Sequence, residues 1–373
     1  MGIGRATETA GVVERLRRLV TLETPSLDPV ASAAIADLLG GWFHQAGARV
    51  ETIPGPAGTH LRLEVAGDGV GEPVLLVGHS DTVWPVGTLA GRVPWSVAGD
   101  VVRGPGVYDM KSGLVVMLAA LERLRGTAHR PVRIVIVSDE EVGSPTSQEL
   151  IRAGLDGVAA AIGFESPHPD GALKVGRRGS SRVRLSVQGK AAHAALDPAA
   201  GVSAIDELVD QLIEVRRIVG TAGGAGEVLC NAGTISGGGR ANVVPDRAEC
   251  ELGLRFLDAG TEREVLDRLR GLRPVRPGAR LAMELASHRP AWAAGPADRA
   301  LAASIGATAA ALGRPVGARP AAGAGDTNLI GALGVPTVDG FGPRGGGAHA
   351  ADEHVLLSSL LERIDLLVAV LRR

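Results

Sequence analysis

The chain has 373 residues, more than one average domain holds, and we therefore expect two domains or one domain with a large insertion. Hydrophobic residues make up 45% and aromatic residues only 2%, so aliphatic side chains must fill a sizeable core. The formal net charge of −2 argues against nucleic acid or an anionic membrane as a partner, and no apolar run reaches the roughly 18 residues of a membrane span.

The first part of the sequence alternates strands with helices. Periodicity predicts helices at 10–22, 29–46 and 111–124, and β-rich runs at 60–65, 74–79, 132–137 and 158–164. The alternation predicts an α/β domain with a mostly parallel central sheet covered on both faces. The opening residues lead directly into an amphipathic helix, so we expect no secretory leader.

The pattern changes near Gly176. Residues 181–189 alternate as SRVRLSVQG, the period-2 pattern of a sheet with one face in water. A helix (203–219), strands (228–235 and 248–256), a helix (261–272) and a strand (280–285) follow. This order predicts an inserted α+β domain, ferredoxin-like in its β-α-β-β-α-β order, over 177–289. The α/β pattern resumes at Pro290, so residues 1–176 and 290–373 form a discontinuous catalytic domain.

Polar residues stand where the predicted parallel strands end. His79 and Asp81 stand at the end of the second β-rich run, Glu140 and Glu141 at the end of the third, and Glu165 at the end of the fourth. Asp109 lies in the loop GPGVYDMKSG and His349 in GGGAHAADEHV. The carboxyl ends of parallel strands meet at one sheet edge, where ligands bind. Carboxylates gathered there repel one another unless a cation joins them. Imidazole and carboxylate ligands without cysteine favour Zn²⁺, Co²⁺ or Mn²⁺.

Each residue alone has a plainer interpretation. A histidine or aspartate at a strand end often caps a loop in water, and a Glu-Glu pair is favoured in the first turn of a helix. The order of these residues along successive strand ends is what favours a metal site. Cys230 and Cys250 lie outside all of these motifs, which predicts free thiols in a reducing cytoplasm.

Six segments resemble the M20 family of metallopeptidases and aminoacylases, nearest to its glutamate carboxypeptidase-like branch and similar also to acetylornithine deacetylase and succinyl-diaminopimelate desuccinylase. The segments are GHSDTVWP, GPGVYDMKSG, SDEEVGS, GFES, VQGKAAHA and GAHAADE, in that order along nearly the whole chain. The resemblance implies a two-zinc exopeptidase-like fold, an inserted dimerisation and lid domain, and a homodimer.

The resemblance also implies a role for each residue of the metal site. Asp109 bridges two ions, His79 and Glu165 complete one ion's ligands, and Glu141 and His349 complete the other's. Glu140 is the general base, Asp81 orients the His79 ring, and the Asp109–Met110 peptide bond is cis. In such a site a water between two ions loses its proton near neutral pH, and the hydroxide attacks the amide carbonyl.

The resemblance places three more roles outside the metal ligands. His193 stabilises the oxyanion in the partner's active site, Asn242 binds near the substrate carbonyl or carboxylate, and Arg289 clamps the free carboxylate bidentately. Asp326 lies in the loop AGAGDTN, which lines the substrate pocket, and there Gly325 replaces the hydroxyl residue that relatives often carry. Lone surface residues are the alternative for His193 and Arg289.

These observations predict a cytoplasmic two-metal hydrolase that cleaves an amide bond next to a free carboxylate, in a peptide-like or N-acyl amino acid substrate. A narrower alternative is a biosynthetic deacylase of an N-acetyl or N-succinyl amino acid. A third is a metal-dependent binding protein without catalysis, which the presence of every expected ligand and of Glu140 disfavours.

Overall fold

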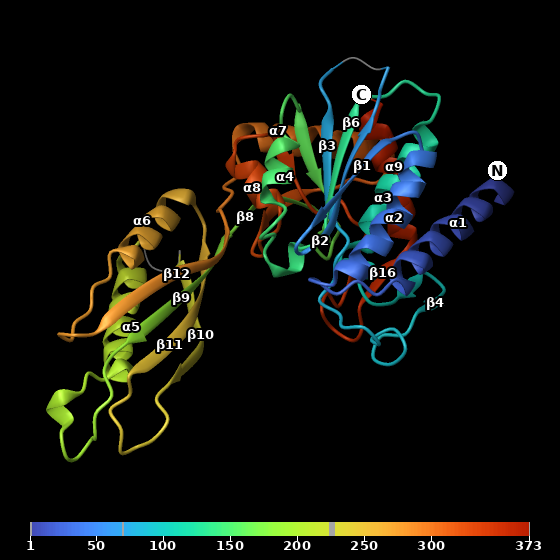
Figure 1. Cartoon of the computed structure of the whole chain (residues 1–373). Helices are drawn as coiled ribbons and strands as arrows, with labels where there is room; N and C mark the ends of the chain where they lie inside the picture. The colour runs from blue at the N-terminus through green and yellow to red at the C-terminus, as the bar shows by residue number, and fades with distance from the viewer. Residues whose placement is uncertain (1, 69–70, 224–227, 373) are drawn as a thin grey trace. The chain divides into compact units, whose positions relative to one another are not determined.

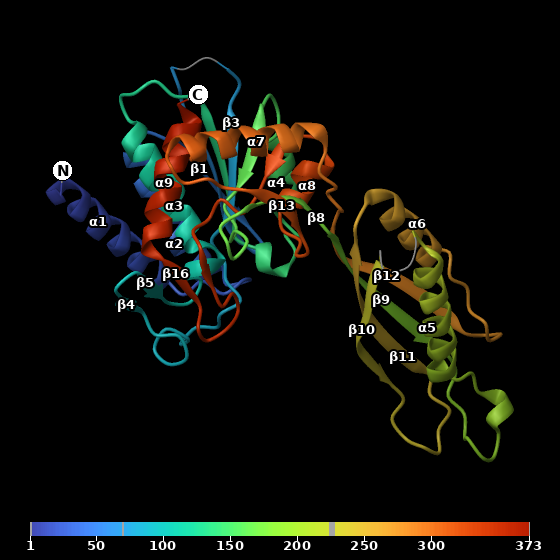
Figure 2. The same cartoon turned by 180° about the vertical axis from the view of Figure 1, so that it is seen from behind.

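The computed structural model describes residues 2–68, 71–223 and 228–372, and the chain divides into two compact units (Figures 1 and 2). Unit 1 extends to Gly176, continues over Ala294–Ala321 and resumes at Gly325. Unit 2 comprises Arg177–Ala293 with Ala322–Ala324. The sequence pattern predicts the second boundary at Pro290, and in the structure unit 1 resumes at Ala294.

Unit 1 is built on a six-stranded sheet in the order β1-β2-β6-β3-β7-β14. The pairs β6–β3, β3–β7 and β7–β14 are parallel, whereas β1–β2 and β2–β6 are antiparallel. The predicted α/β domain with a mainly parallel sheet is therefore confirmed. The strands are β1 (Arg49–Gly55), β2 (Gly58–Val65), β3 (Val74–His79), β6 (Val132–Val137), β7 (Ala160–Gly163) and β14 (Thr337–Val338).

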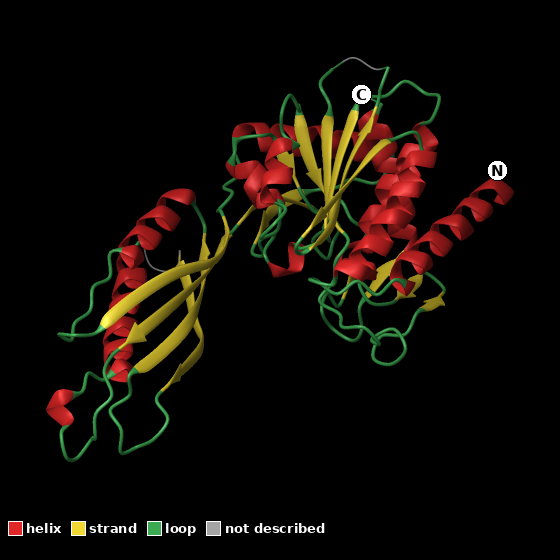
Figure 3. Ribbon diagram, in the orientation of Figure 1, coloured by secondary structure: helices red, strands yellow, loops and turns green. Residues whose placement is uncertain are grey.

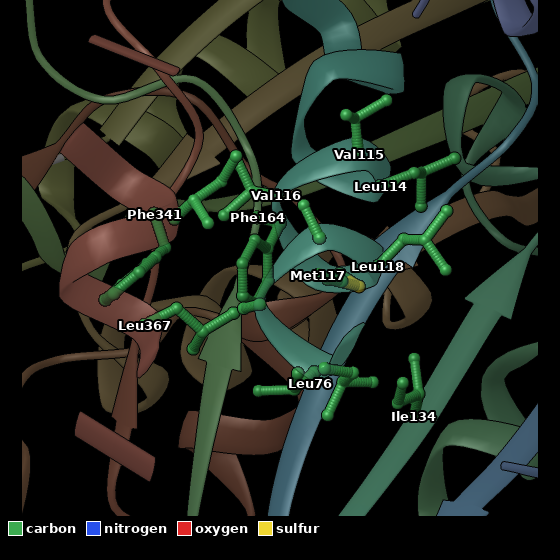
Figure 4. Close-up of a cluster of buried hydrophobic side chains, with 14 of the residues drawn as sticks. Leu76, Leu114, Val115, Val116, Met117, Leu118, Ile134, Phe164, Phe341 and Leu367 are labelled. Carbon is green, nitrogen blue, oxygen red and sulfur yellow. The ribbon is translucent and has the colours of Figure 1, made fainter. Parts of the chain in front are cut away.

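Helices cover both faces of this sheet. Alternate residues of each strand point to opposite sides, and both sets of β3 side chains are apolar, so each face needs a cover. Leu76 of β3 packs with α3 in the larger core cluster, shown in Figure 4, whereas Leu75 and Val77 pack with α4 and α8 on the other face. The helices of the first face include α1 (Gly2–Thr21), α2 (Pro29–Gln45), α3 (Ser112–Leu124), α7 (Pro296–Ala311) and α9 (Leu357–Leu371); those of the second are α4 (Gln148–Ala153) and α8 (Thr327–Ala332).

Helix α3 lies at the centre of the larger cluster. Residues 112–121 are buried on every side, which is the pattern of a helix packed between a sheet and other helices. Burial of each large aliphatic side chain contributes about 1.5–3 kcal/mol, so this helix forms a rigid support for the loop that precedes it. That loop carries Asp109.

The remaining strands of unit 1 are short. They form a four-stranded sheet, β15-β16-β5-β4, and a two-stranded sheet, β13-β8. Segments of two to five residues are too brief for a periodic pattern, so the sequence does not predict them. They are β4 (Ser96–Ala98), β5 (Val101–Arg103), β8 (Leu173–Arg177), β13 (Ala318–Ala321), β15 (Gly345–Gly346) and β16 (His354–Leu356).

Unit 2 is an antiparallel sheet in the order β10-β11-β9-β12 with two helices on one face (Figure 3). Val183, Leu185 and Val187 of β9 are buried against α5 and α6, while Arg182 and Arg184, which alternate with them, face solvent. This order confirms the predicted ferredoxin-like α+β domain. Its elements are β9 (Gly179–Gln188), α5 (Ala204–Thr221), β10 (Val228–Gly237), β11 (Arg247–Phe256), α6 (Ala259–Arg270) and β12 (Arg280–Arg289).

Within the described ranges, none of the helices is both long and apolar enough to cross a lipid bilayer.

Candidate metal centre

Strands β3, β6 and β7 end side by side at one edge of the sheet of unit 1. His79, the last residue of β3, is level with the last residue of β6, and Val77 is level with Gly163 of β7. His79 and Glu165 each lie two residues beyond the matched pair Val77 and Gly163, so Glu165 follows β7 at the level of His79. Glu140 follows β6 by three residues. The parallel register therefore brings the predicted ligands His79 and Glu165 together with the predicted general base Glu140.

The predicted bridging carboxylate lies between two histidines. His79 Nε2 is 3.2 Å from Asp109 Oδ1 and 3.3 Å from Glu165 Oε1. His349 Nε2 is 3.3 Å from Asp109 Oδ2 and 3.2 Å from Glu141 Oε2. Each oxygen of Asp109 thus faces a different histidine, as expected of a carboxylate shared by two ion sites. The Asp109–Met110 peptide bond is cis, which confirms that prediction.

The donor atoms are close enough to share ions. The ligand atoms of His79, Glu140 and Glu165 lie within 4.8 Å of one another, and so do those of His79, Asp109 and Glu141. Oε1 of Glu141 is buried and has no hydrogen-bond partner among the residues that the structure describes. An orphaned carboxylate oxygen in a set of imidazole and carboxylate donors fits a divalent cation, so the residues present fit a dinuclear metal site.

The carboxylates of the cluster favour the protonated form of both imidazoles. Burial lowers the pKa of His79, but hydrogen bonds to Asp109, Asp81 and Glu165 raise it well above its usual value. Hydrogen bonds to Asp109 and Glu141 raise the pKa of His349 to about 10. Burial alone raises the pKa of Asp109, but the two histidines lower it overall. A cation that binds these nitrogens would have to displace their protons.

Asp81 contacts more than the His79 ring. His79 Nδ1 is 3.0 Å from the backbone oxygen of Asp81 and 3.4 Å from its carboxylate Oδ1. The carboxylate also accepts hydrogen bonds from the backbone N–H groups of Glu140 and Glu141, both at 3.2 Å, and from the Ser26 hydroxyl at 2.6 Å. Asp81 therefore orients the ring mainly through its carbonyl and joins the end of β3 to the Glu140–Glu141 turn through its carboxylate.

Glu353 organises the loop of Asp109, although the sequence pattern assigns it no role. Its fully buried carboxylate accepts hydrogen bonds from Trp84 Nε1 (2.6 Å) and from the backbone N–H groups of Gly106 (3.0 Å), Tyr108 (2.9 Å) and Asp109 (3.2 Å). The only signal in the sequence is an acid at the end of GAHAADE.

Two further buried charges support the site. Asp139 accepts hydrogen bonds from Thr146 N and Oγ1, both at 2.8 Å, and from Ser147 Oγ at 2.5 Å, which closes the loop that carries Glu140. Lys111 Nζ donates to the carbonyl oxygens of residues 19 and 22 at the end of α1, and burial lowers its pKa to about 7. The segment SDEEVGS contains Asp139, but its partners become evident only in the fold.

His193 and Asn242 lie close together in unit 2. The N–H of Ala194 donates to the carbonyl oxygen of Asn242 at 3.0 Å, and both predicted side chains are exposed. His193 Nδ1 accepts the backbone N–H groups of residues 195 and 196 at 3.2 and 3.1 Å. Nδ1 is thereby held as the acceptor, which leaves the proton on Nε2 of the neutral ring.

Arg289 lies at the other end of the same sheet. It is half-buried at the end of β12, where its Cα is level with Ser180 near the start of β9. From Ser180 to Gln188 the strand spans roughly 26 Å at about 3.3 Å per residue. His193 and Asn242 follow beyond Gln188, so one copy of unit 2 does not bring all three residues to the same ligand.

Asp326 precedes α8 and contacts the turn after Glu141. Its Oδ1 accepts a hydrogen bond from the Ser144 hydroxyl, and the side chain is buried. Ser144 has a φ of 56°, in the left-handed region that residues other than glycine rarely adopt. This contact connects the predicted pocket residue Asp326 to the loop that carries Glu140 and Glu141.

Comparison with known proteins gives one family and relatives of two activities. The model of "Peptidase family M20/M25/M40" matches residues 75–373. Carboxypeptidase G2 of Pseudomonas sp. is 28% identical over 371 residues, covering 96% of this chain and 88% of that protein. A putative succinyl-diaminopimelate desuccinylase of Mycobacterium tuberculosis is 31% identical over 301 residues, covering 79% and 80%.

Solved structures share the fold at low sequence identity. A Staphylococcus aureus tripeptidase has a TM-score of 0.77 at 21% identity and covers 98% of both chains. An M20 family metallo-carboxypeptidase of Sulfolobus solfataricus has a TM-score of 0.71 at 16% identity, covering 96% of this chain and 98% of that one.

Proposed function

The chain belongs to peptidase family M20/M25/M40, and from this premise we propose that it cleaves an amide bond next to a free carboxylate in a peptide-like or N-acyl amino acid substrate. The family makes it a metal-dependent amidohydrolase with a dinuclear site and peptide-like substrates. The observation that carries the proposal is the carboxylate of Asp109, which faces His79 with one oxygen and His349 with the other.

The ligand set supports two ions of the zinc type. His79 and Glu165 would hold one ion, Glu141 and His349 the other, and Asp109 both; Co²⁺ and Mn²⁺ suit the same donors. When bound, such ions supply Lewis acidity to the scissile carbonyl and acidify the attacking water. The ring of His79 reaches its position because Nδ1 is directed at the Asp81 carbonyl, which leaves Nε2 toward the carboxylates.

Glu140 is suited to move the proton. Its carboxylate is nearly buried and lies with His79 and Glu165 at the metal cluster, while its backbone N–H is held by Asp81. A carboxylate held this way takes the proton of the attacking water and returns it to the leaving nitrogen. Neighbouring Glu141 is directed to His349 instead, so the two adjacent acids serve different tasks.

The arrangement of unit 2 supports a homodimer with shared sites. Arg289 is the cation for the substrate carboxylate, and His193 and Asn242 serve the oxyanion and carbonyl. Because Arg289 lies at the opposite end of the sheet from the other two, a complete set requires His193 and Asn242 of a second copy. The exposed edge strand β10 next to β11 offers backbone groups for antiparallel pairing with its own copy.

Helix α5 adds an apolar face to the proposed contact between copies. Ile205, Val209 and Ile213 follow one another at four-residue spacing and are all exposed. The two cysteines are free thiols, which supports a reducing compartment, and we place the reaction in the cytoplasm.

The relatives divide over substrate class, and two enzyme functions follow from them. A carboxypeptidase-like relative favours broad cleavage next to a carboxylate, and a desuccinylase favours a narrow deacylase of N-succinyl or N-acetyl amino acids. A binding protein without catalysis remains a third, remote alternative, which the presence of Glu140 and of all five ligands disfavours.

Turnover of a substrate panel tests the proposal. The purified chain, loaded with Zn²⁺ or Co²⁺, is assayed on N-acyl-glutamate, N-succinyl amino acids, N-acetylornithine and dipeptides. Glu140→Gln should lose most turnover and keep both metals, whereas Glu149→Gln, an exposed acid paired with Arg152 on α4, should match the unmodified enzyme. Absence of amide turnover with both metals bound contradicts catalysis, and turnover confined to one acyl group favours the narrow deacylase.

Mixed dimers test the shared site. His193→Ala and Asp109→Asn should each be nearly inactive, but a mixture of the two should regain activity, because a hybrid dimer contains one intact metal centre served by one intact histidine. Native mass spectrometry reports whether hybrids form. Hybrids that form without any recovery of activity would refute the shared site.

A further inference from the structure

A cavity in unit 1 outside the metal centre is lined by arginines. It has a volume of about 270 Å³ and lies between α7, α9 and the loop after β7, helices that are labelled in Figure 2. Arg314, Arg344 and Arg363 line it together with Asp170 and Glu362. At about 30 Å³ for a water molecule, the space holds a compact anion with several waters.

Arg363 differs from the other two cations of this cavity. It is 4% exposed, and its recorded hydrogen bonds are to carbonyl oxygens: Nε to Gly342 at 3.0 Å and Nη2 to Gly171 at 2.5 Å. Neither acceptor carries a charge. Burial and the nearby Arg344 lower the pKa of Arg363 to about 10, although the charge of Glu362 acts to raise it. A buried guanidinium without a hydrogen-bonded carboxylate is costly unless an anion approaches it.

Of the two acids that line the cavity, Asp170 is paired with an arginine outside it and Glu362 with Arg344 inside it. Both oxygens of Asp170 accept from Arg319, at 2.7 and 2.9 Å, and Arg319 does not line the cavity. Glu362 is 3.3 Å from Arg344. Arg314 is 2.8 Å from Asp365, which also pairs with a second arginine. The lining therefore retains one positive charge in excess, on the least exposed side chain.

Arg363 also connects two segments that lead to the metal centre. Gly342, whose carbonyl it binds, donates its N–H to the backbone oxygen of Glu165 at 2.9 Å. The Arg363 guanidinium lies 5.7 Å from the ring centre of Phe341, which is 5.3 Å from that of Phe164, and both rings are labelled in Figure 4. Arg363 is therefore linked through Gly342 to the backbone of Glu165, on the segment that continues to His349.

We propose that this cavity binds a compact divalent oxyanion of the phosphate class, anchored by Arg363 and contacted by Arg344 and Arg314. Guanidinium groups bind such oxyanions through paired N–H donors, and a doubly charged anion compensates the excess charge better than water does. Occupancy stabilises the segments that lead to Glu165 and His349. This site is independent of the amide substrate.

Thermal unfolding with added anion tests the site. The metal-loaded full chain is titrated with inorganic phosphate and, separately, inorganic sulfate at low millimolar concentration and constant ionic strength set by chloride. The melting temperature should rise saturably with both anions. Hydrogen exchange should slow in peptides covering 163–171 and 341–346 when the anion is bound.

Variants separate this site from general effects. Arg344→Gln and Arg314→Gln should weaken the apparent anion affinity roughly tenfold each, which corresponds to one lost charge-assisted contact. Arg363→Gln should abolish the response; because this side chain also supports the backbone, the other two variants keep the test decisive if it does not fold. Arg49→Gln, which changes an exposed arginine of β1 that pairs with Glu64 and does not line this cavity, should respond as the unmodified protein does.

Three results would overturn the proposal: no saturable response in the unmodified protein, an equal response in all arginine variants, or a response that disappears in His349→Ala. The last would assign the anion to the metal centre.

Discussion

Replacement of Glu353 by Gln removes one charge from the centre of the loop that carries Asp109. The carboxylate accepts four N–H donors, two at each oxygen: Tyr108 and Asp109 at Oε1, Trp84 and Gly106 at Oε2. In Glu353→Gln one oxygen becomes an NH₂ group. Whichever way the amide is oriented, two N–H donors then face another donor and lose their acceptor.

The magnitude follows from these contacts. A hydrogen bond to a charged group contributes about 1.5–3 kcal/mol, so loss of two corresponds to roughly 3–6 kcal/mol. Burial raises the pKa of Glu353, which means that the charged form is itself disfavoured there, and the amide avoids that penalty. We therefore expect a loss near the lower end, about 3 kcal/mol, a large part of the 5–15 kcal/mol typical of a domain.

Urea unfolding and metal titration measure the two consequences. The urea midpoint of Glu353→Gln should fall, and its metal affinity should weaken about 10- to 100-fold, because the backbone that presents Asp109 is no longer held. Asp352→Asn makes the same charge change at the exposed neighbouring residue and should stay within about 0.5 kcal/mol of the unmodified chain. An unchanged midpoint together with unchanged metal affinity would refute the role of Glu353.

Four other predictions test the metal centre and its support. His79→Ala should reduce the bound metal from two ions to one, whereas Asp81→Asn should keep two ions with about 10- to 100-fold weaker affinity. Atomic absorption measures the bound metal, and the same number of ions in both variants contradicts this ranking. Metal binding at pH 7 should release about two protons, because both imidazoles are protonated before metal binds. Calorimetry in buffers of different ionisation enthalpy measures this release, and a result of no released protons contradicts the prediction. The folded-state pKa of His349, about 10, exceeds its usual 6.5. Its protonated ring therefore stabilises the fold without metal fully below about pH 6.5, and this contribution is lost as the pH rises to about 10. Urea midpoints that rise over this pH range contradict the prediction. Asp139→Asn should cost about 1.5–3 kcal/mol, because at least one of its three acceptor contacts is lost, and an unaltered urea midpoint would exclude that support.

The alternation of strands and helices was predictable because it depends on residues close in sequence. The runs 74–79 and 132–137 coincide with β3 and β6, and the predicted helix at 111–124 begins one residue late, at Ser112. Lys111 itself has helical backbone angles and ends the short π-helical turn Val107–Lys111 that leads directly into α3, so the difference is one of helix type at the boundary. Strands of two or three residues, such as β15 and β16, have too few side chains for a pattern.

The candidate ligands were predictable for a similar reason. The candidate ligand His79 ends a strand, and the candidate ligand Glu165 and the candidate base Glu140 follow strands; parallel strands bring such residues to a common edge. The contact of His79 Nδ1 with the carbonyl of Asp81 rather than chiefly with its carboxylate was not predictable, because it depends on how the chain turns after β3. The backbone hydrogen bonds that occupy the Asp81 carboxylate come from a turn that is 59 and 60 residues away in sequence.

The sequence by itself determined which residue types arrive at the end of each strand, because hydrophobic periodicity and strand ends are local properties of the chain. Only the tertiary structure decided which of them meet and what holds them. Glu353 reaches the backbone of Asp109 across 244 residues, and Arg289 is separated from His193 and Asn242 by the length of β9. Contacts between residues so distant in sequence depend on sheet register and packing, which leave no periodic trace in the chain.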